Sequence, residues 1–168
     1  SLPHTLNGFD LIGCAQTGTG KTAAFSIPML TRLLEDEESL ALVLAPTREL
    51  AAQIQDTIKV LTSHAKFIRH GLIIGGASFS EQVRMLRSRP RILVATPGRL
   101  VDHLKQKTIS LANVKFFVLD EADRMFDMGF APQIRQITNQ IPSDRQTLLF
   151  SATFSKEIKA LALQALKS

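Results

Sequence analysis

A glycine-rich segment near the start of the chain has the residue types of a phosphate-binding loop. It consists of Ala15, Gln16, Thr17, Gly18, Thr19, Gly20, Lys21 and Thr22. Gly18 and Gly20 allow backbone N–H groups to turn inward, where they and the N-terminus of a following helix can surround phosphate oxygens. Lys21 would reach the β- and γ-phosphates of a nucleotide, and the Thr22 hydroxyl would bind Mg²⁺. The usual motif begins with Gly where this chain has Ala15, so a glycine-rich turn without a ligand is the alternative interpretation.

A pair of acidic residues, Asp120 and Glu121, follows the apolar run 116–119. A buried apolar strand would hold such acids rigidly beside bound phosphates. Asp120 would hold Mg²⁺, usually through its water shell, and Glu121 would orient and deprotonate an attacking water. The alternative is the start of an acid-rich helix, which the helix dipole favours in any case.

Short apolar runs recur along the chain, and each is followed by a turn and a helix-like segment. They cover residues 10–14, 40–45, 70–74, 92–95, 116–120 and 147–151. Strands that alternate with helices predict an α/β fold, in which helices flank both faces of a parallel sheet. The carboxyl ends of parallel strands lie at one edge, where ligands bind. We therefore expect the segments that follow the strands to converge on one site.

Several residues predict where helices begin, bend or end. Thr47 and Ser155 have the type and position of N-terminal caps, and Ser78 has capping-box spacing with Glu81. Pro28 falls inside the first helical pattern and should kink that helix or end its first half. A basic cluster precedes the strand at 92–95, at the edge opposite the site, and is interpreted as a solvated surface. Its members are Arg84, Arg87, Arg89 and Arg91.

The composition is that of one well-buried domain. The chain has 168 residues, of which 45% are apolar, and a formal net charge of +5 that permits a polyanionic partner without identifying one. No apolar run reaches the roughly 18 residues of a membrane helix, and a signal peptide is not evident. The single cysteine, Cys14, cannot form an internal disulfide, which fits a reducing compartment. We expect a soluble, cytoplasmic protein.

Polar, glycine-containing or charged segments follow all of the predicted strands. After the phosphate loop come residues 46–51 (Pro-Thr-Arg-Glu-Leu-Ala), 75–76 (Gly-Gly), 96–99 (Thr-Pro-Gly-Arg), 120–123 (Asp-Glu-Ala-Asp) and 151–153 (Ser-Ala-Thr). In this order they resemble the motifs of the first RecA-like domain of a DEAD-box ATP-dependent RNA helicase. The resemblance covers essentially all of residues 1–168. It implies one P-loop NTPase domain of RecA-like fold that uses ATP and Mg²⁺.

The resemblance also implies roles for residues outside the nucleotide site. Asp123 would act through Ser151 and Thr153 in coupling the state of the nucleotide to the grip on RNA. The implied RNA-binding residues are Thr47, Arg48, Gly76, Thr96 and Arg99. Physical reasoning agrees, because the glycines allow close approach and arginines form charge-assisted bonds to phosphates. A plain tight turn is the alternative for Gly75 and Gly76.

The expected partners are RNA and a second RecA-like domain of the same polypeptide. We expect the protein to be a monomer. The chain has ten Phe but neither Tyr nor Trp, and we expect most of the Phe to lie in the core. With no evident platform for stacking bases, RNA binding should run through the backbone, carry little sequence information and depend on salt. The adenine-reading Gln of the family belongs upstream of residue 2, so weak and poorly selective nucleotide binding is expected. Without the second domain the chain should be poorly active.

Two alternative functions remain open. The chain could be a non-catalytic nucleotide- or RNA-binding docking module, but the presence of Lys21, Thr22, Asp120 and Glu121 together favours an enzyme. It could also be a related P-loop motor that acts on DNA, because no residue demonstrably reads a ribose 2′-hydroxyl group.

Overall fold

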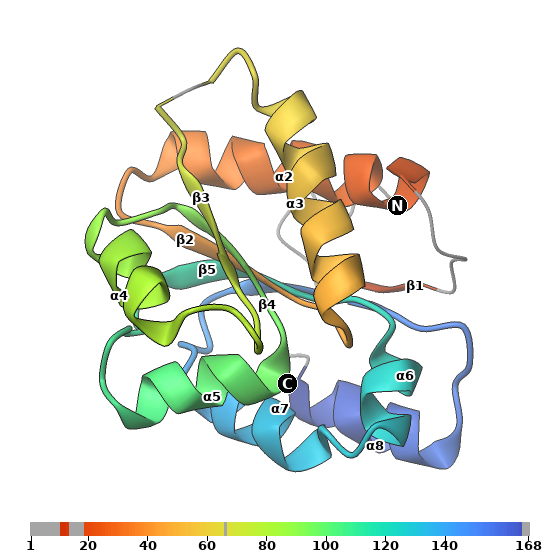
Figure 1. Ribbon diagram of the computed structural model, residues 1–168. Helices are drawn as coiled ribbons and strands as arrows, with labels where there is room; N and C mark the ends of the chain where they lie inside the picture. The colour runs from red at the N-terminus through yellow and green to blue at the C-terminus, as the bar shows by residue number, and fades with distance from the viewer. Residues whose placement is uncertain (1–10, 14–18, 66, 166–168) are drawn as a thin grey trace.

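The fold is built around a parallel sheet, shown in Figure 1, a computed structural model that describes residues 11–13, 19–65 and 67–165. The strands are β1 (Leu11–Gly13), β2 (Leu40–Leu44), β3 (His70–Ile73), β4 (Ile92–Ala95), β5 (Val114–Leu119) and β6 (Gln146–Phe150). Their order across the sheet is β1-β6-β5-β2-β4-β3, and every neighbouring pair is parallel. This confirms the predicted α/β architecture.

Helices follow the strands and cover both faces of the sheet. They are α2 (Thr19–Glu35), α3 (Arg48–Leu61), α4 (Phe79–Arg87), α5 (Pro97–Lys105), α6 (Ala122–Asp127), α7 (Ala131–Asn139) and α8 (Lys156–Ala165). In Figure 1, α2 and α3 lie on one face, α5 to α8 lie on the other, and α4 lies near β3. Among the described residues, no helix combines the length and the apolar character needed to cross a membrane.

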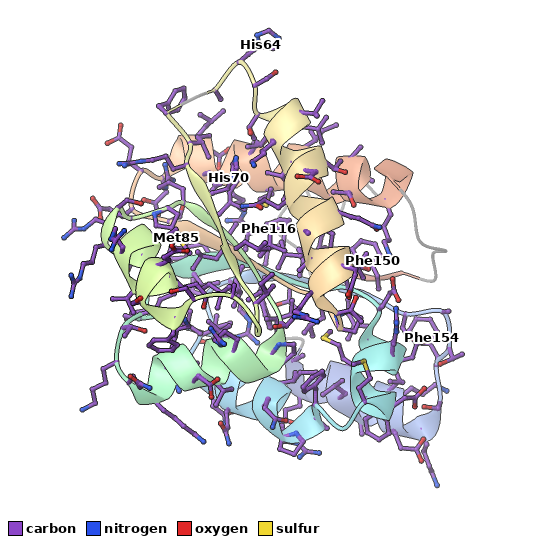
Figure 2. The ribbon with its side chains drawn as sticks, in the orientation of Figure 1. His64, His70, Met85, Phe116, Phe150 and Phe154 are labelled. Atoms are coloured by element: carbon purple, nitrogen blue, oxygen red, sulfur yellow. The ribbon has the colours of Figure 1, made fainter. Side chains whose placement is uncertain are left out.

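Because both faces are covered, the sheet separates two layers of core side chains. Phe116 and Phe150 contribute to the layer beneath α2 and α3 (Figure 2), together with Phe25 of α2. Phe117 and Leu119 contribute to the layer beneath α5 to α8. Burial on both sides explains why the strand sequences are continuously apolar instead of alternating. These phenylalanines fulfil the expectation of core packing, whereas Phe67 is 69% exposed.

The predicted caps are confirmed by hydrogen bonds at three helix starts. The hydroxyl oxygens of Thr47, Ser78 and Ser155 accept hydrogen bonds from the backbone N–H groups of residues three positions later, at 3.1, 3.3 and 3.2 Å. Capping of α3, α4 and α8 matters for the site, because each of these helices begins just after a site-forming segment.

The expectation that Pro28 could end the first helix is wrong, because α2 continues through it to Glu35. Pro28 is itself buried, and its neighbours Phe25 and Met29 are almost completely buried against the sheet. Packing along the whole helix therefore outweighs the loss of one backbone hydrogen bond at proline.

The interpretation of the basic cluster as solvated is wrong for Arg91. Its Nη2 donates to the carbonyl oxygens of Leu33 at 2.7 Å and Asp36 at 2.6 Å, and its Nε donates to that of Ser39 at 2.8 Å. These bonds satisfy carbonyl groups at and just beyond the end of α2, where a cation also complements the helix dipole. The other arginines of the cluster, Arg84, Arg87 and Arg89, are exposed as expected.

Candidate functional site

The described parts of the predicted site lie at the carboxyl edge of the sheet. Residues 15–18 of the predicted phosphate loop fall outside the described residues, so their binding of phosphate remains a prediction. Thr19 and Gly20 begin α2, and the side chains are described from Lys21 onward. The Asp120 backbone N–H donates to the Leu44 carbonyl oxygen at 2.9 Å, which anchors the acidic segment at the end of β5.

Lys21 and Asp120 form a buried ion pair between the start of α2 and the end of β5. Lys21 Nζ lies 2.5 Å from Asp120 Oδ1, and the two side chains are only 5% and 1% exposed. Lys21 Nζ also lies 5.7 Å from the ring centroid of Phe150, whose π face favours a cation. Residues far apart in sequence therefore meet where the sequence predicted a nucleotide site.

The Asp120 carboxylate has spare capacity for a ligand. Apart from the ion pair with Lys21, neither of its oxygens has a hydrogen bond of good geometry to any described residue. Leaving a buried carboxylate oxygen without a hydrogen bond is costly, and a hard cation bound through oxygen would compensate for it. Thr22, whose side chain could supply a second oxygen, is 4% exposed. These donors fit Mg²⁺, which takes few protein ligands and retains water and phosphate oxygens.

Glu121 has a backbone conformation that is rare for its residue type. Its φ of 51° and ψ of 54° place it in the left-handed region at the N-cap of α6. Such strain is concentrated at functional sites. Its side chain makes no capping hydrogen bond and instead lies 3.6 Å from Arg124 Nη1. Glu121 thus stands at the N-cap of α6 with a carboxylate that pairs with Arg124 and does not cap the helix.

Asp123 contacts the segment that follows β6, as the resemblance implies. The Thr153 hydroxyl donates to Asp123 Oδ2 at 3.3 Å. The Ser151 hydroxyl donates to the Thr153 carbonyl oxygen at 2.7 Å, within the same turn. Asp123, Thr153 and Ser151 thus form a short chain of contacts between α6 and the end of β6.

A groove of about 400 Å³ lies among the segments that follow β2, β3 and β4. It brings together the predicted RNA-binding residues Thr47, Arg48, Thr96 and Arg99, with Gly75 between them. The other lining residues are Pro46, Glu49, Gly98, Asp102, Met128 and Phe130. Met128 and Phe130 were not expected from the sequence, because they come from the connection between α6 and α7.

Gly76 lies behind Arg48 rather than in the lining of the groove. Its φ is +80°, and Arg48 Nη1 occupies the space that a Cβ atom at this position would need. Both observations require glycine, because other residues are strained at this φ and a side chain would displace the arginine. The turn interpretation and the RNA interpretation of this glycine are therefore compatible.

Two buried polar residues next to Arg99 were also not predicted from the sequence as part of the site. Gln82 of α4 is 5% exposed and His103 of α5 is 0% exposed, and they hydrogen-bond each other. The available signal was weak: Gln82 lies between Phe79 and Leu86 at helical spacing, and His103 follows Leu100 by three residues. Burial and the nearby Arg99 cation lower the pKa of His103 below its usual value.

Comparison with known proteins supports the motif-based resemblance. The DEAD/DEAH box helicase model matches residues 1–161. The chain belongs to this family. The named motifs therefore lie in a DEAD/DEAH box domain, and the matched region includes both the buried ion pair and the groove.

Relatives from yeasts and bacteria match nearly the whole chain. It is 50% identical over 163 residues to the ATP-dependent rRNA helicase RRP3 of Candida albicans, covering 96% of this chain and 30% of the relative. It is 51% identical to RRP3 of Debaryomyces hansenii, covering 96% of this chain and 34% of that protein. It is 47% identical to the DEAD-box ATP-dependent RNA helicase CshA of Bacillus cereus, covering 96% and 31%. The chain thus spans about a third of the length of these relatives.

Proposed function

We propose that residues 1–168 form the ATP-binding RecA-like domain of an ATP-dependent RNA helicase. The observation that carries the proposal is the buried Asp120 carboxylate, which has Lys21 as its ion-pair partner and oxygens available for a cation. Family membership and the helicase names of the relatives agree with it.

In the nucleotide half of the site, Lys21 binds the β- and γ-phosphates of ATP together with the backbone of residues 15–20. Asp120 and Thr22 hold Mg²⁺, which neutralises charge on the phosphates. Glu121 orients the attacking water and accepts its proton. The strained Glu121 backbone sets the direction of this side chain at the end of β5.

In the groove, the chain binds the backbone of single-stranded RNA. Arg48 and Arg99 donate charge-assisted hydrogen bonds to phosphates, and Thr47 and Thr96 offer hydroxyl groups beside them. Because these contacts reach the phosphates and sugars, affinity should fall steeply with added salt and vary little with base sequence. A strong sequence preference with little salt dependence would argue against this mode of binding.

The contacts of Asp123 with Thr153 couple the two halves. ATP brings a second RecA-like domain of the same polypeptide against this edge, and hydrolysis releases it, so that local RNA duplexes are unwound. An arginine supplied by the second domain can contribute about 10³- to 10⁵-fold in rate, so full activity is expected only from the intact polypeptide, which we propose is monomeric.

The test is steady-state phosphate release from ATP by the intact protein that contains this chain. It is measured without nucleic acid, with single-stranded RNA and with DNA of the same sequence. We expect RNA alone to stimulate turnover, and Glu121→Gln to abolish it. The matched control is Glu157→Gln on exposed α8, which should change nothing.

Other outcomes assign other functions. Equal stimulation by DNA would indicate a P-loop motor that is not selective for RNA. Turnover that neither nucleic acid stimulates, and that Glu121→Gln leaves unchanged, would indicate a docking module with a vestigial site.

A further inference from the structure

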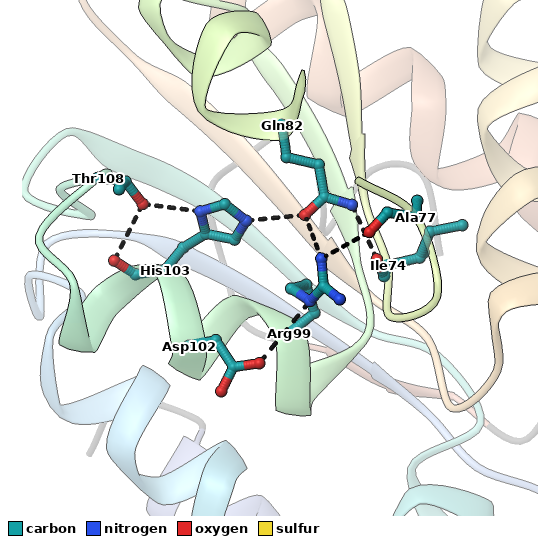
Figure 3. A network of polar contacts seen from close by, with 7 residues as sticks. All are labelled: Ile74, Ala77, Gln82, Arg99, Asp102, His103 and Thr108. Carbon is teal, nitrogen blue, oxygen red and sulfur yellow. Dashed lines mark hydrogen bonds and ion pairs between the residues drawn. The ribbon is translucent and has the colours of Figure 1, made fainter. Parts of the chain in front are cut away.

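A polar network between α4 and α5 holds the guanidinium group of Arg99 (Figure 3). Arg99 Nη1 donates to Gln82 Oε1 at 3.2 Å and to the Ala77 carbonyl oxygen at 3.1 Å. Gln82 Oε1 also lies 2.8 Å from His103 Nε2, and His103 Nδ1 lies 2.7 Å from the Thr108 hydroxyl. The network therefore runs from the groove back along α5 to residue 108.

Donor and acceptor chemistry defines the orientation of each group. Gln82 Nε2 donates to the Ile74 carbonyl oxygen at 2.8 Å, so its Oε1 is the atom that faces His103 and Arg99. A carbonyl oxygen can only accept, and His103 Nε2 must therefore carry the proton that it shares with Gln82. In the neutral imidazole, Nδ1 is then an acceptor for the Thr108 hydroxyl, whose single proton is shared with the His103 carbonyl oxygen 3.1 Å away.

Arg99 is held by one of its terminal nitrogens and keeps the other free for a ligand. Both N–H groups of Nη1 are used by Gln82 and Ala77, whereas Nη2 has no hydrogen-bond partner among the described residues. Asp102, at 3.7 Å from Nε, is 59% exposed, and such surface pairs contribute little. The fixed geometry thus depends on Gln82 and on the carbonyl oxygen of Ala77.

His103 in turn is held in place by packing as well as by hydrogen bonds. Its ring stacks on that of Phe79, with centroids 4.0 Å apart and an angle of 5° between the planes. The Arg99 guanidinium carbon lies 5.7 Å from the centroid of Phe79. Burying the polar groups of Gln82 and His103 between α4 and α5 has a desolvation cost that apolar side chains would avoid. A purely structural role therefore does not explain why polar residues occupy these positions.

We propose that Gln82 and His103 are positioning residues that fix the Arg99 guanidinium for a nucleic-acid phosphate in the groove. Gln82 holds Nη1, and His103 fixes the rotamer of Gln82. Fixing the side chain in advance removes part of the conformational entropy that Arg99 would otherwise lose on binding. This inference rests on the proposed function, because it takes Arg99 to contact RNA.

The experiment measures the affinity of the intact protein for a fluorescently labelled oligouridylate over a series of salt concentrations. A non-hydrolysable ATP analogue is kept saturating. Gln82→Met retains the side-chain volume but removes the acceptor and donor. Gln164→Met, on the exposed face of α8, is the matched control. Circular dichroism verifies that each variant is folded at the temperature used.

Arg99→Ala should weaken binding by about three- to tenfold and reduce the salt slope by about one. Gln82→Met should weaken binding by a smaller factor, and in the Arg99→Ala background it should change affinity by less than about twofold. Gln164→Met should leave affinity unchanged. Loss of the Gln82 effect when Arg99 is absent is a result that a general structural defect would not produce.

A second pair of variants tests His103 even if Gln82→Met does not fold. His103→Leu removes the donor to Gln82 and should weaken RNA binding, whereas a glutamine at this position can place an amide N–H near the site of Nε2. His103→Gln should therefore restore affinity to within about twofold of the unmodified protein.

The possible failures are distinguishable. Suppose that Arg99→Ala weakens RNA binding. If Gln82→Met then has no effect, or has the same effect in the Arg99→Ala background as in the unmodified protein, the positioning role is wrong and the RNA function stands. Equal weakening by His103→Leu and His103→Gln would also overturn the role of the His103 donor. If Arg99→Ala changes neither affinity nor salt slope, or no RNA binds at all, the proposed RNA site fails and the inference fails with it.

Discussion

The two halves of the carboxyl edge hold their charged groups in opposite ways. In the nucleotide half, Lys21 and Asp120 are buried, and the Asp120 oxygens lack hydrogen bonds of good geometry to the described residues. In the groove, Arg48 is exposed, and Arg99 is held through Gln82 and the carbonyl oxygen of Ala77. In one half, a buried carboxylate has no hydrogen bond to the described residues, whereas in the other, neighbouring groups hold the Arg99 guanidinium in place. Substitutions should therefore act on chemistry in the first half and on affinity in the second.

The largest effect is expected for Asp120→Asn, which removes the charge proposed to hold Mg²⁺. RNA-stimulated phosphate release by the intact protein should fall by about 10²- to 10³-fold, because electrostatic stabilisation of the phosphates is lost. Asp144→Asn is the matched control, since Asp144 is 92% exposed and, among the described residues, forms an ion pair only with Lys115, at 3.4 Å. Comparable activity in the two variants would show that Asp120 is not required for catalysis.

Gly76→Ala should weaken RNA binding through Arg48 and also destabilise the fold. The added Cβ atom forces the Arg48 guanidinium to move, and alanine at a φ of +80° adds strain of about 1 kcal/mol to the folded state. Gly129→Ala is matched for strain, with a φ of +85° and no atom within 4 Å of the added Cβ.

Chemical denaturation and RNA titration together separate the two effects. Both glycine variants should lose similar stability, but Gly76→Ala should lose more RNA affinity, by several fold, and have a shallower salt slope. Equal loss of affinity in both would show that strain, and not displacement of Arg48, is responsible.

A smaller effect is expected for Thr153→Val, which removes the hydroxyl that donates to Asp123. That bond is long, at 3.3 Å, and its loss should reduce stimulation of ATP turnover by RNA by only a few fold. Thr153→Ser keeps the hydroxyl and serves as the control. Equal stimulation in the Val and Ser variants would exclude this contact from the coupling of the two halves.

The smallest effect concerns pH and the buried His103. Its pKa in the folded protein is lowered by burial and by Arg99, with Asp102 opposing the shift. Below a pH of about 6.5, His103 binds a proton more readily in the unfolded chain than in the folded protein. The contribution of neutral His103 to the free energy of unfolding is therefore present above that pH and is lost as the pH falls. One proton changes the free energy of unfolding by at most about 1.4 kcal/mol per pH unit.

Chemical denaturation between pH 7.5 and 5.5 measures this contribution. His70, whose pKa is lowered by burial and by Lys59, acts in the same direction, so the comparison with His103→Gln isolates the part due to His103. The variant should lose less stability over this range than the unmodified protein. An identical pH dependence would mean that His103 resists protonation no more in the folded protein than in the unfolded chain.

Residue types and their spacing are enough to predict the alternation of strands and helices and the segments at the carboxyl edge. Each of these depends on local features: continuous apolar runs mark strands that are buried on both faces, and Thr47, Ser78 and Ser155 cap helices through hydrogen bonds three residues away. The grouping of Thr47, Arg48, Thr96 and Arg99 followed from the single rule that parallel strands end at one edge.

Packing between distant segments sets the strand order, the path of α2 through Pro28 and the partners of the buried polar groups. Arg91 satisfies carbonyl groups more than 50 residues earlier in the chain, and Gln82 meets Arg99 because α4 packs against α5. The physical reason is the same in each case. A hydrogen bond between distant segments depends on how helices pack, and residue type and spacing within one segment carry no information about that packing.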